Sequence, residues 1–135
     1  MDRLFLDANV LFSAAYKLDS RLLQLWKFKD VGLCSSRYAL EEARCNLQDE
    51  IQQRALRNLS GTLHLFEAAD RGLPRGLSLP DKDAPIFLAA VEARATHLLT
   101  GDVQHFGQYF GSRFEGVVIM LPGQYFKVRE RNPKR

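Results

Sequence analysis

Short apolar runs alternate along the chain with longer segments in which apolar residues recur at helical spacing. Five short runs predict β-strands, at residues 4–6, 31–36, 61–67, 96–102 and 116–122. Amphipathic helices are predicted where apolar residues recur every three or four positions, at residues 10–14, 20–28, 37–56 and 81–95. This alternation favours an α/β fold with a mostly parallel central sheet and helices on both faces.

Local signals mark where three of these helices begin. Ser20 and Ser36 stand just before two of the helical segments, where a hydroxyl can accept a hydrogen bond from a free backbone N–H. Asp81 and Asp83 open the helix at 81–95, and Pro85 is tolerated there because it falls in the first turn. The Gly- and Pro-rich residues 69–81, which lead into this helix, predict a loop.

The size and composition indicate one ordinary globular domain. The chain has 135 residues, of which 46% are hydrophobic, enough to close a single core. No apolar run approaches the roughly 20 residues that span a bilayer. The N-terminal MDRLFLDANV mixes both charges and has no small-residue cleavage site, so we expect a cytoplasmic protein without a membrane segment.

The positive charge is concentrated at the C-terminus. The last seven residues, RERNPKR, carry four basic residues and one acidic residue, which equals the net charge of +3 of the whole chain. We therefore expect a single domain over residues 1–128 and a basic tail over 129–135. Such a tail either contacts nucleic-acid phosphates or is a solvated chain end.

Acidic residues lie where strands end or helices begin. They occupy four separate segments: Asp7, Glu41 with Glu42, Asp81 with Asp83, and Asp102. In a parallel α/β sheet, ligands bind at the carboxyl ends of the strands, so these acids are expected to converge there. Crowded carboxylates repel one another, and Mg²⁺ or Mn²⁺ compensates such a cluster because it prefers hard oxygen ligands.

Four segments resemble the successive motifs of PIN-domain nucleases. They are FLDANVLFSAA, SSRYALEEARCNL, DKDAPIFLAAVEARATHLLTGDVQHF and VVIMLPGQYF, in the order of the family and within residues 3–126. The resemblance implies a three-layer α/β sandwich and metal-dependent cleavage of RNA, with one or two Mg²⁺ or Mn²⁺ ions. Small members resemble VapC-type toxin ribonucleases, which implies an antitoxin partner and a homodimer.

The resemblance also implies which acids form the site. Asp7, Asp83 and Asp102 match the first, third and fourth acids of the family. The second acid is either Glu41 or Glu42, and the count of six residues from Ser36 favours Glu42.

For each of several other residues near these acids, the sequence allows two roles. Asn9 orients Asp7 or begins a helix, Thr100 bonds a carboxylate or a water, and Asp81 is a helix cap or an additional ligand. His105 stands near the place where some members carry a further acid, so it is a capping residue or a phosphate contact. Three basic residues near the acids hold phosphate or are solvated, namely Arg37, Arg44 and Lys82.

Two other functions remain open from the sequence. One is a PIN-like domain without catalysis that binds RNA or another protein. The other is a phosphotransferase in which Asp7 is the nucleophile, although Asn9 stands where such enzymes have a second aspartate.

Overall fold

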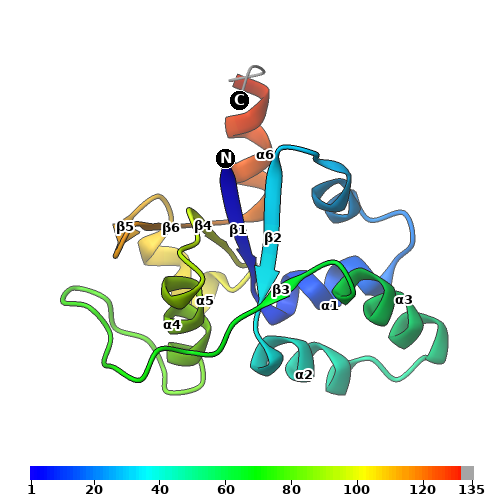
Figure 1. The fold of residues 1–135 in the computed structure, drawn as a ribbon, viewed down its shortest axis with the longest axis horizontal. Coiled ribbons are helices and arrows are strands. Elements are labelled where there is room, and N and C mark those ends of the chain that lie inside the picture. Colours follow the sequence, from blue (N-terminus) through cyan, green and yellow to red (C-terminus); the bar gives the residue numbers. More distant parts are fainter. Residues whose placement is uncertain (132–135) are drawn as a thin grey trace.

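A computed structural model describes residues 1–131, which form one mixed sheet surrounded by helices (Figure 1). The strands are β1 (Asp2–Leu6), β2 (Val31–Ser35), β3 (His64–Leu65), β4 (His97–Leu99), β5 (Arg113–Phe114) and β6 (Val117–Met120). The α-helices are α1 (Ala8–Tyr16), α2 (Arg37–Asn46), α3 (Glu50–Ser60), α4 (Ala84–Glu92), α5 (Val103–Phe106) and α6 (Pro122–Arg131). Two 3₁₀ helices, η1 (Arg21–Lys27) and η2 (Gly107–Tyr109), complete the described chain.

The sheet has the strand order β3-β2-β1-β4-β6-β5, and only the pairing of β5 with β6 is antiparallel. The chain runs outward from β1 to β2 and β3, and then crosses back to β4 and β6. Right-handed crossovers in these two directions place helices on opposite faces of the sheet. Figure 1 accordingly shows α1, α2 and α3 on one side of β1, and α4 and α5 on the other. The predicted α/β fold is confirmed.

The core lies around β1 and α4. Leu4, Phe5 and Leu6 are fully buried, as expected for a central parallel strand covered on both faces. Helix α4 is apolar around most of its circumference, with Ile86 to Ala90 buried. These two rigid elements end or begin at acidic residues, so the core determines where those acids lie.

The five predicted strands are present, and β5 is an additional strand. The third predicted strand shortens to His64–Leu65, whose side chains are exposed. β5 pairs with β6 around a two-residue turn, in which Glu115 and Gly116 both have positive φ. Such a turn is the usual tight hairpin connection. A two-residue strand carries too few positions for a hydrophobic pattern, which explains why β5 was not predicted.

The single helix predicted over residues 37–56 is wrong, because the structure divides it into α2 and α3. Asp49 begins the second helix, and its side chain accepts hydrogen bonds from the backbone N–H groups of Ile51 (2.7 Å) and Gln52 (3.2 Å). Leu47 stays buried at the break, while Ile51 is 66% exposed. The apolar spacing that joined Leu47 to Ile51 in one helical face was therefore coincidental.

Two chain segments differ in detail from their predictions. The segment after Ser20 is a 3₁₀ helix, and the Ser20 hydroxyl accepts a hydrogen bond from the Leu22 N–H (3.2 Å) as predicted. Helix α6 continues to Arg131, so the first three residues of the expected basic tail are helical. Arg129 pairs with Asp30 at 3.0 Å, and residues 132–135 lie outside the described chain. Within residues 1–131, none of the helices is long and apolar enough to cross a membrane.

The break between α2 and α3 makes one stability prediction. We expect Asp49→Ala to lower the free energy of unfolding by about 1 kcal/mol, because it removes the side-chain cap of α3. Asp49→Asn should change stability little, since asparagine caps helices as well as aspartate does. Urea denaturation of the three proteins checks this, and equal stability of the alanine variant would contradict the capping role.

Candidate active site

Asp7 is the first residue after β1 and caps α1. Its Oδ1 accepts a hydrogen bond from the Ala8 N–H (2.7 Å), and the residue is only 4% exposed. The cap fixes the carboxylate at the carboxyl end of the central strand. This end adjoins β4, where the direction of strand order reverses, and such reversals are the usual ligand sites of open α/β sheets.

Thr100 and Asn9 join Asp7 to the end of β4. The Thr100 hydroxyl donates to Asp7 Oδ2 (2.7 Å) and accepts from the Asp102 N–H (3.1 Å). Asn9 Nδ2 donates to Asp7 Oδ2 (3.2 Å), while Asn9 Oδ1 accepts from the Gly101 N–H (2.7 Å). A Cβ at position 101 would lie 3.3 Å from Asn9 Oδ1, so glycine lets the two chain segments approach closely.

Asp83 stands at the N-cap position of α4, yet its side chain makes no capping hydrogen bond. The residue is buried, and Oδ2 forms no hydrogen bond with any residue in the described part of the chain. His105 Nδ1 lies 3.1 Å from this oxygen, within ion-pair distance, although the angles do not form a hydrogen bond. A buried carboxylate oxygen without a donor is costly unless a cation compensates it.

Asp102 follows β4 and caps the short helix α5. Its Oδ1 accepts from the His105 N–H (3.0 Å), and its Oδ2 lies 2.8 Å from His105 Nδ1. The side-chain ligand atoms of Asp83, Asp102 and His105 lie within 4.8 Å of one another. Sequence reasoning did not place His105 between two acids. The feature of the sequence that could have indicated this position is that His105 lies three residues after Asp102. When Asp102 caps the helix, this spacing brings the histidine ring next to its carboxylate.

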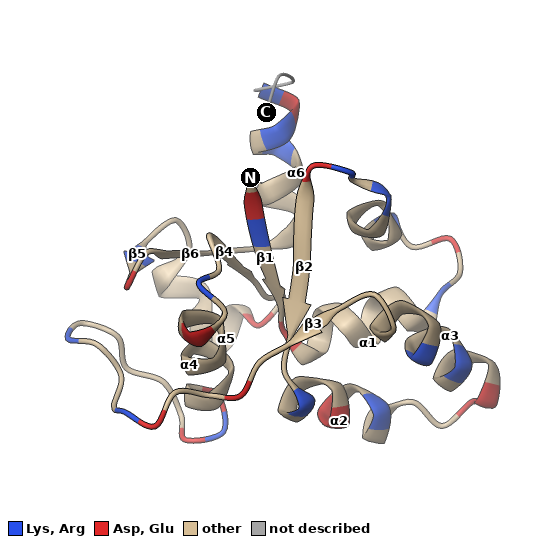
Figure 2. Ribbon diagram, in the orientation of Figure 1, with Lys and Arg blue, Asp and Glu red and all other residues tan. Residues whose placement is uncertain are grey.

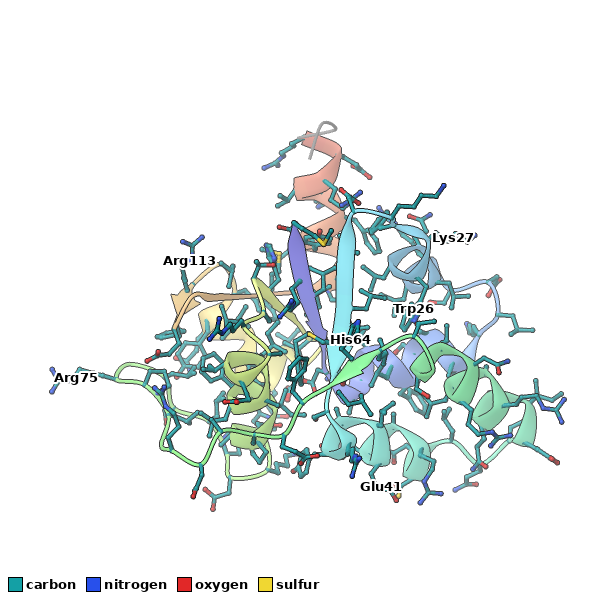
Figure 3. All side chains as sticks on the ribbon, in the orientation of Figure 1. Trp26, Lys27, Glu41, His64, Arg75 and Arg113 are labelled. Atoms are coloured by element: carbon teal, nitrogen blue, oxygen red, sulfur yellow. The ribbon has the colours of Figure 1, made fainter. Side chains whose placement is uncertain are left out.

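The structure separates the two candidate glutamates of α2. Glu42 lines the same pocket as Asp7, Asp83 and Asp102. Both glutamates are exposed, but Glu41 lies outside this pocket and pairs with Arg44, whose Nε lies 3.0 Å from the glutamate Oε2. Figure 3 shows Glu41 pointing away from the rest of the molecule.

The pocket has a volume of about 530 Å³, in the range of ligand sites. It contains all four expected acids and Asn9. Asp81 is exposed and does not line it. The pocket is also lined by Phe12 and Asn46, which were not predicted as site residues. Lys82, which was predicted either to hold phosphate or to be solvated, lines it as well.

The other two candidate phosphate contacts lie elsewhere. Arg37 and Arg44 line a separate groove of about 350 Å³ between α2 and α3, together with Arg57. Lys82 is therefore the one basic residue among those that line the acidic pocket.

Burial and mutual repulsion make these acids harder to ionise. Burial raises the pKa of Asp7 to about 6; the hydrogen bonds from Thr100 and Ala8 oppose this, and the charges of Asp83 and Glu42 add to it. The pKa of Glu42 is raised, first by burial and then by the charge of Asp83.

The pKa of Asp83 is raised as well, mainly by burial. The charge of Asp102 adds to this rise, while His105 opposes it. Three of the four acids, Asp7, Glu42 and Asp83, have a raised pKa, and Asp83 also has the buried oxygen that forms no hydrogen bond with the described residues. Together with Asp102 they form a set of oxygen donors that fits a hard divalent cation such as Mg²⁺ or Mn²⁺.

Comparison with known proteins identifies a family and a fold that match this chain. A family model described as PIN domain matches residues 3–104. A chain in the crystal structure of VapBC2 from Rickettsia felis bound to a DNA fragment from their promoter has the same fold, with a TM-score of 0.65. The two chains are 16% identical, and the match covers 88% of this chain and 98% of that chain. None of the curated protein sequences matches this chain.

The buried Asp83 carboxylate, whose pKa is raised despite the nearby His105, makes a prediction about stability and pH. We expect Asp83→Asn to raise the melting temperature of the metal-free protein at neutral pH. The folded state holds the Asp83 proton more tightly than the unfolded chain does, so the ionised carboxylate destabilises the folded state. This advantage should shrink as the pH falls toward the ordinary aspartate value, where both states become protonated.

Thermal melts in chelator across this pH range measure the effect. Asp81→Asn is the matched control, because Asp81 is exposed and lies two residues away, and we expect no shift at any pH. A lower melting temperature for Asp83→Asn at neutral pH would show that the carboxylate is needed for folding.

Proposed function

Because this chain belongs to the PIN domain family, we propose that it is a divalent-metal-dependent nuclease that hydrolyses phosphodiester bonds of RNA. One observation carries the proposal. Carboxylates from four separate segments line one pocket, and within residues 1–131 nothing forms a hydrogen bond with the buried Asp83 Oδ2 among them. His105 Nδ1 lies 3.1 Å from that oxygen but forms no hydrogen bond with it, so the oxygen keeps its lone pairs available for a metal ion.

Asp7, Glu42, Asp83 and Asp102 would hold one or two Mg²⁺ or Mn²⁺ ions. When bound, such an ion supplies charge for the scissile phosphate and lowers the pKa of a water molecule. Thr100 and Asn9 fix the orientation of Asp7, and His105 fixes that of Asp102. Ligands held by such outer contacts keep their geometry without reorganisation.

Asp7 is better suited to this role than to that of a nucleophile. Oδ1 accepts one hydrogen bond and Oδ2 accepts two, and the residue is 4% exposed. A phosphotransferase of this kind has a second aspartate two residues after its nucleophile, and here that position is Asn9, whose amide donates to Asp7 Oδ2. The geometry therefore favours metal-assisted hydrolysis over phosphotransfer through Asp7.

Basic residues are available for the substrate backbone. Lys82 lies in the pocket itself, where its charge lowers the pKa of Glu42 and can attract a phosphate. Further Lys and Arg residues lie on α2, α3 and α6 (Figure 2). The pocket is acidic and its surroundings are mixed, so a polyanion is accommodated once a cation has neutralised the centre.

We further propose that the chain is the toxin of a toxin–antitoxin pair, with an antitoxin protein as partner and a homodimer as its assembly. The resemblance to VapC-type toxin ribonucleases and the fold likeness to a chain of VapBC2 support this role. Co-expression with the protein encoded beside it tests the pairing, because a neutralising partner should copurify and block RNA cleavage.

The two adjacent glutamates provide the activity test. We expect Glu42→Gln to lower metal-dependent cleavage of single-stranded RNA at least about tenfold, because a ligand lost from the transition state costs more than about 1 kcal/mol. Glu41→Gln is the matched control and should retain activity, since its carboxylate pairs with Arg44 outside the pocket. If Glu41→Gln lost activity and Glu42→Gln retained it, the metal site would lie on the face of α2 that carries Glu41, and the proposed assignment would be wrong.

Metal binding can be measured without any activity. We expect Mg²⁺ or Mn²⁺ to bind with millimolar or tighter affinity and to raise the melting temperature by mass action. Asp7→Asn should weaken this binding, while Asp81→Asn should leave it unchanged. Titration calorimetry that detects no heat for either metal, well above millimolar concentration, would overturn the site; RNA binding without metal-dependent cleavage would indicate a non-catalytic domain.

A further inference from the structure

Two stacked aromatic rings lie along α1, and one of them lines the acidic pocket. Phe12 is half-buried and lines the pocket with the four acids. Tyr16 follows one turn later, and its ring stacks on that of Phe12 with centroids 5.4 Å apart and planes inclined by 29°. Tyr16 is 49% exposed. Helix α1 therefore follows the Asp7 carboxylate, carries the Phe12 ring in the pocket lining and ends at the exposed Tyr16 ring, which is not among the residues that line the pocket.

The contacts of the pair leave this surface available. Gln52 Nε2 donates to the backbone oxygen of Tyr16 (3.2 Å), which holds the end of α1 against the start of α3. The Tyr16 hydroxyl forms no hydrogen bond with other described residues, so the side chain is positioned only by its packing. Phe12 is only partly exposed, packs against the core and lines the pocket, so its ring is fixed there. A fixed ring that faces a pocket can stack on a nucleobase of any identity.

Asn46 lies at the rim of the same pocket, on the neighbouring helix α2. Its Nδ2 donates to the backbone oxygen of Glu42 (2.9 Å), which orients the amide. The amide oxygen is then left to accept a hydrogen bond from the edge of a bound base. An aromatic face and a polar edge contact are the two elements by which proteins hold an unpaired base.

Charge explains why such a surface is needed. The pocket contains four carboxylates and one lysine, so its wall repels a polyanion before any cation is bound. Stacking is independent of that repulsion, since it acts on the base and not on the phosphate. With a volume of about 530 Å³, the pocket has room for a ligand of nucleotide size.

We propose, resting on the nuclease function above, that Phe12 backed by Tyr16 forms a stacking platform for the base next to the scissile phosphate of single-stranded RNA. Phe12 is thus a positioning residue for the substrate. The platform holds one nucleotide, and the acids act on the phosphate attached to it.

A substitution that removes the ring but keeps an apolar side chain tests this. Phe12→Leu should raise KM for a short single-stranded RNA roughly 5- to 150-fold, the effect of losing one stacked base, with a smaller change in kcat. Phe12→Tyr should restore the affinity. Phe66→Leu is the matched control, because it removes a half-buried ring outside the pocket. With an RNA that is abasic at the stacked nucleotide, wild type and Phe12→Leu should have the same KM.

Binding gives a readout that does not depend on cleavage. A short RNA carrying 2-aminopurine, titrated in Ca²⁺, should lose fluorescence on binding the wild type and should keep it with Phe12→Leu. Absence of quenching by the wild type, or equal loss of affinity for the abasic and the complete RNA, would overturn the platform. Unchanged RNA binding together with an altered oligomeric state would assign this face to protein contacts and would also overturn it.

These outcomes separate the two proposals. RNA that is cleaved equally well by wild type and Phe12→Leu contradicts the stacking platform alone. A wild type that cleaves no RNA in Mg²⁺ or Mn²⁺ contradicts the nuclease, while the fluorescence change still decides whether a base stacks on Phe12.

Discussion

The hydrogen bond from the Thr100 hydroxyl to Asp7 joins the ends of β1 and β4, and the geometry of the pocket depends on it. Both residues are almost completely buried, and each directly follows three buried strand residues, Leu4 to Leu6 of β1 and His97 to Leu99 of β4. Since neighbouring parallel strands cannot shift by one residue without turning every side chain to the other face, the core fixes the two chain ends in register. Asn9 and Gly101 add a second link at the same place.

Holding acids in fixed positions at the ends of buried elements lowers the stability of the folded state, and the rest of the fold offsets this loss. Burial raises the pKa of Asp7 and Asp83, and neither side chain can move away, because one belongs to the end of β1 and the other to the start of the buried helix α4. The apolar core supplies stability while the pocket reduces it. This division is typical of functional sites, where groups are held in an arrangement that an isolated chain would avoid.

The sequence was most informative where the chemistry coincides with the ends of apolar runs. Asp7 and Asp102 were predictable as neighbours because each follows a buried strand, and strands of a parallel sheet share one carboxyl edge. Glu42 and Glu41 could be ranked only weakly, since the deciding fact is which face of α2 meets the pocket. The break at Asp49 and the position of His105 depend on side-chain hydrogen bonds across several residues, which apolar periodicity does not record.

The sheet ends on both sides in strands of two residues, β3 and β5. An edge of this length offers few free backbone N–H and C=O groups, so an incoming strand would gain little by pairing with it. Short edges of this kind protect a protein against edge-to-edge aggregation, and they also limit recognition of partners by strand addition. Contacts with other macromolecules therefore fall to the side chains of the helices and loops, whose surfaces can change without altering the sheet that holds the acids.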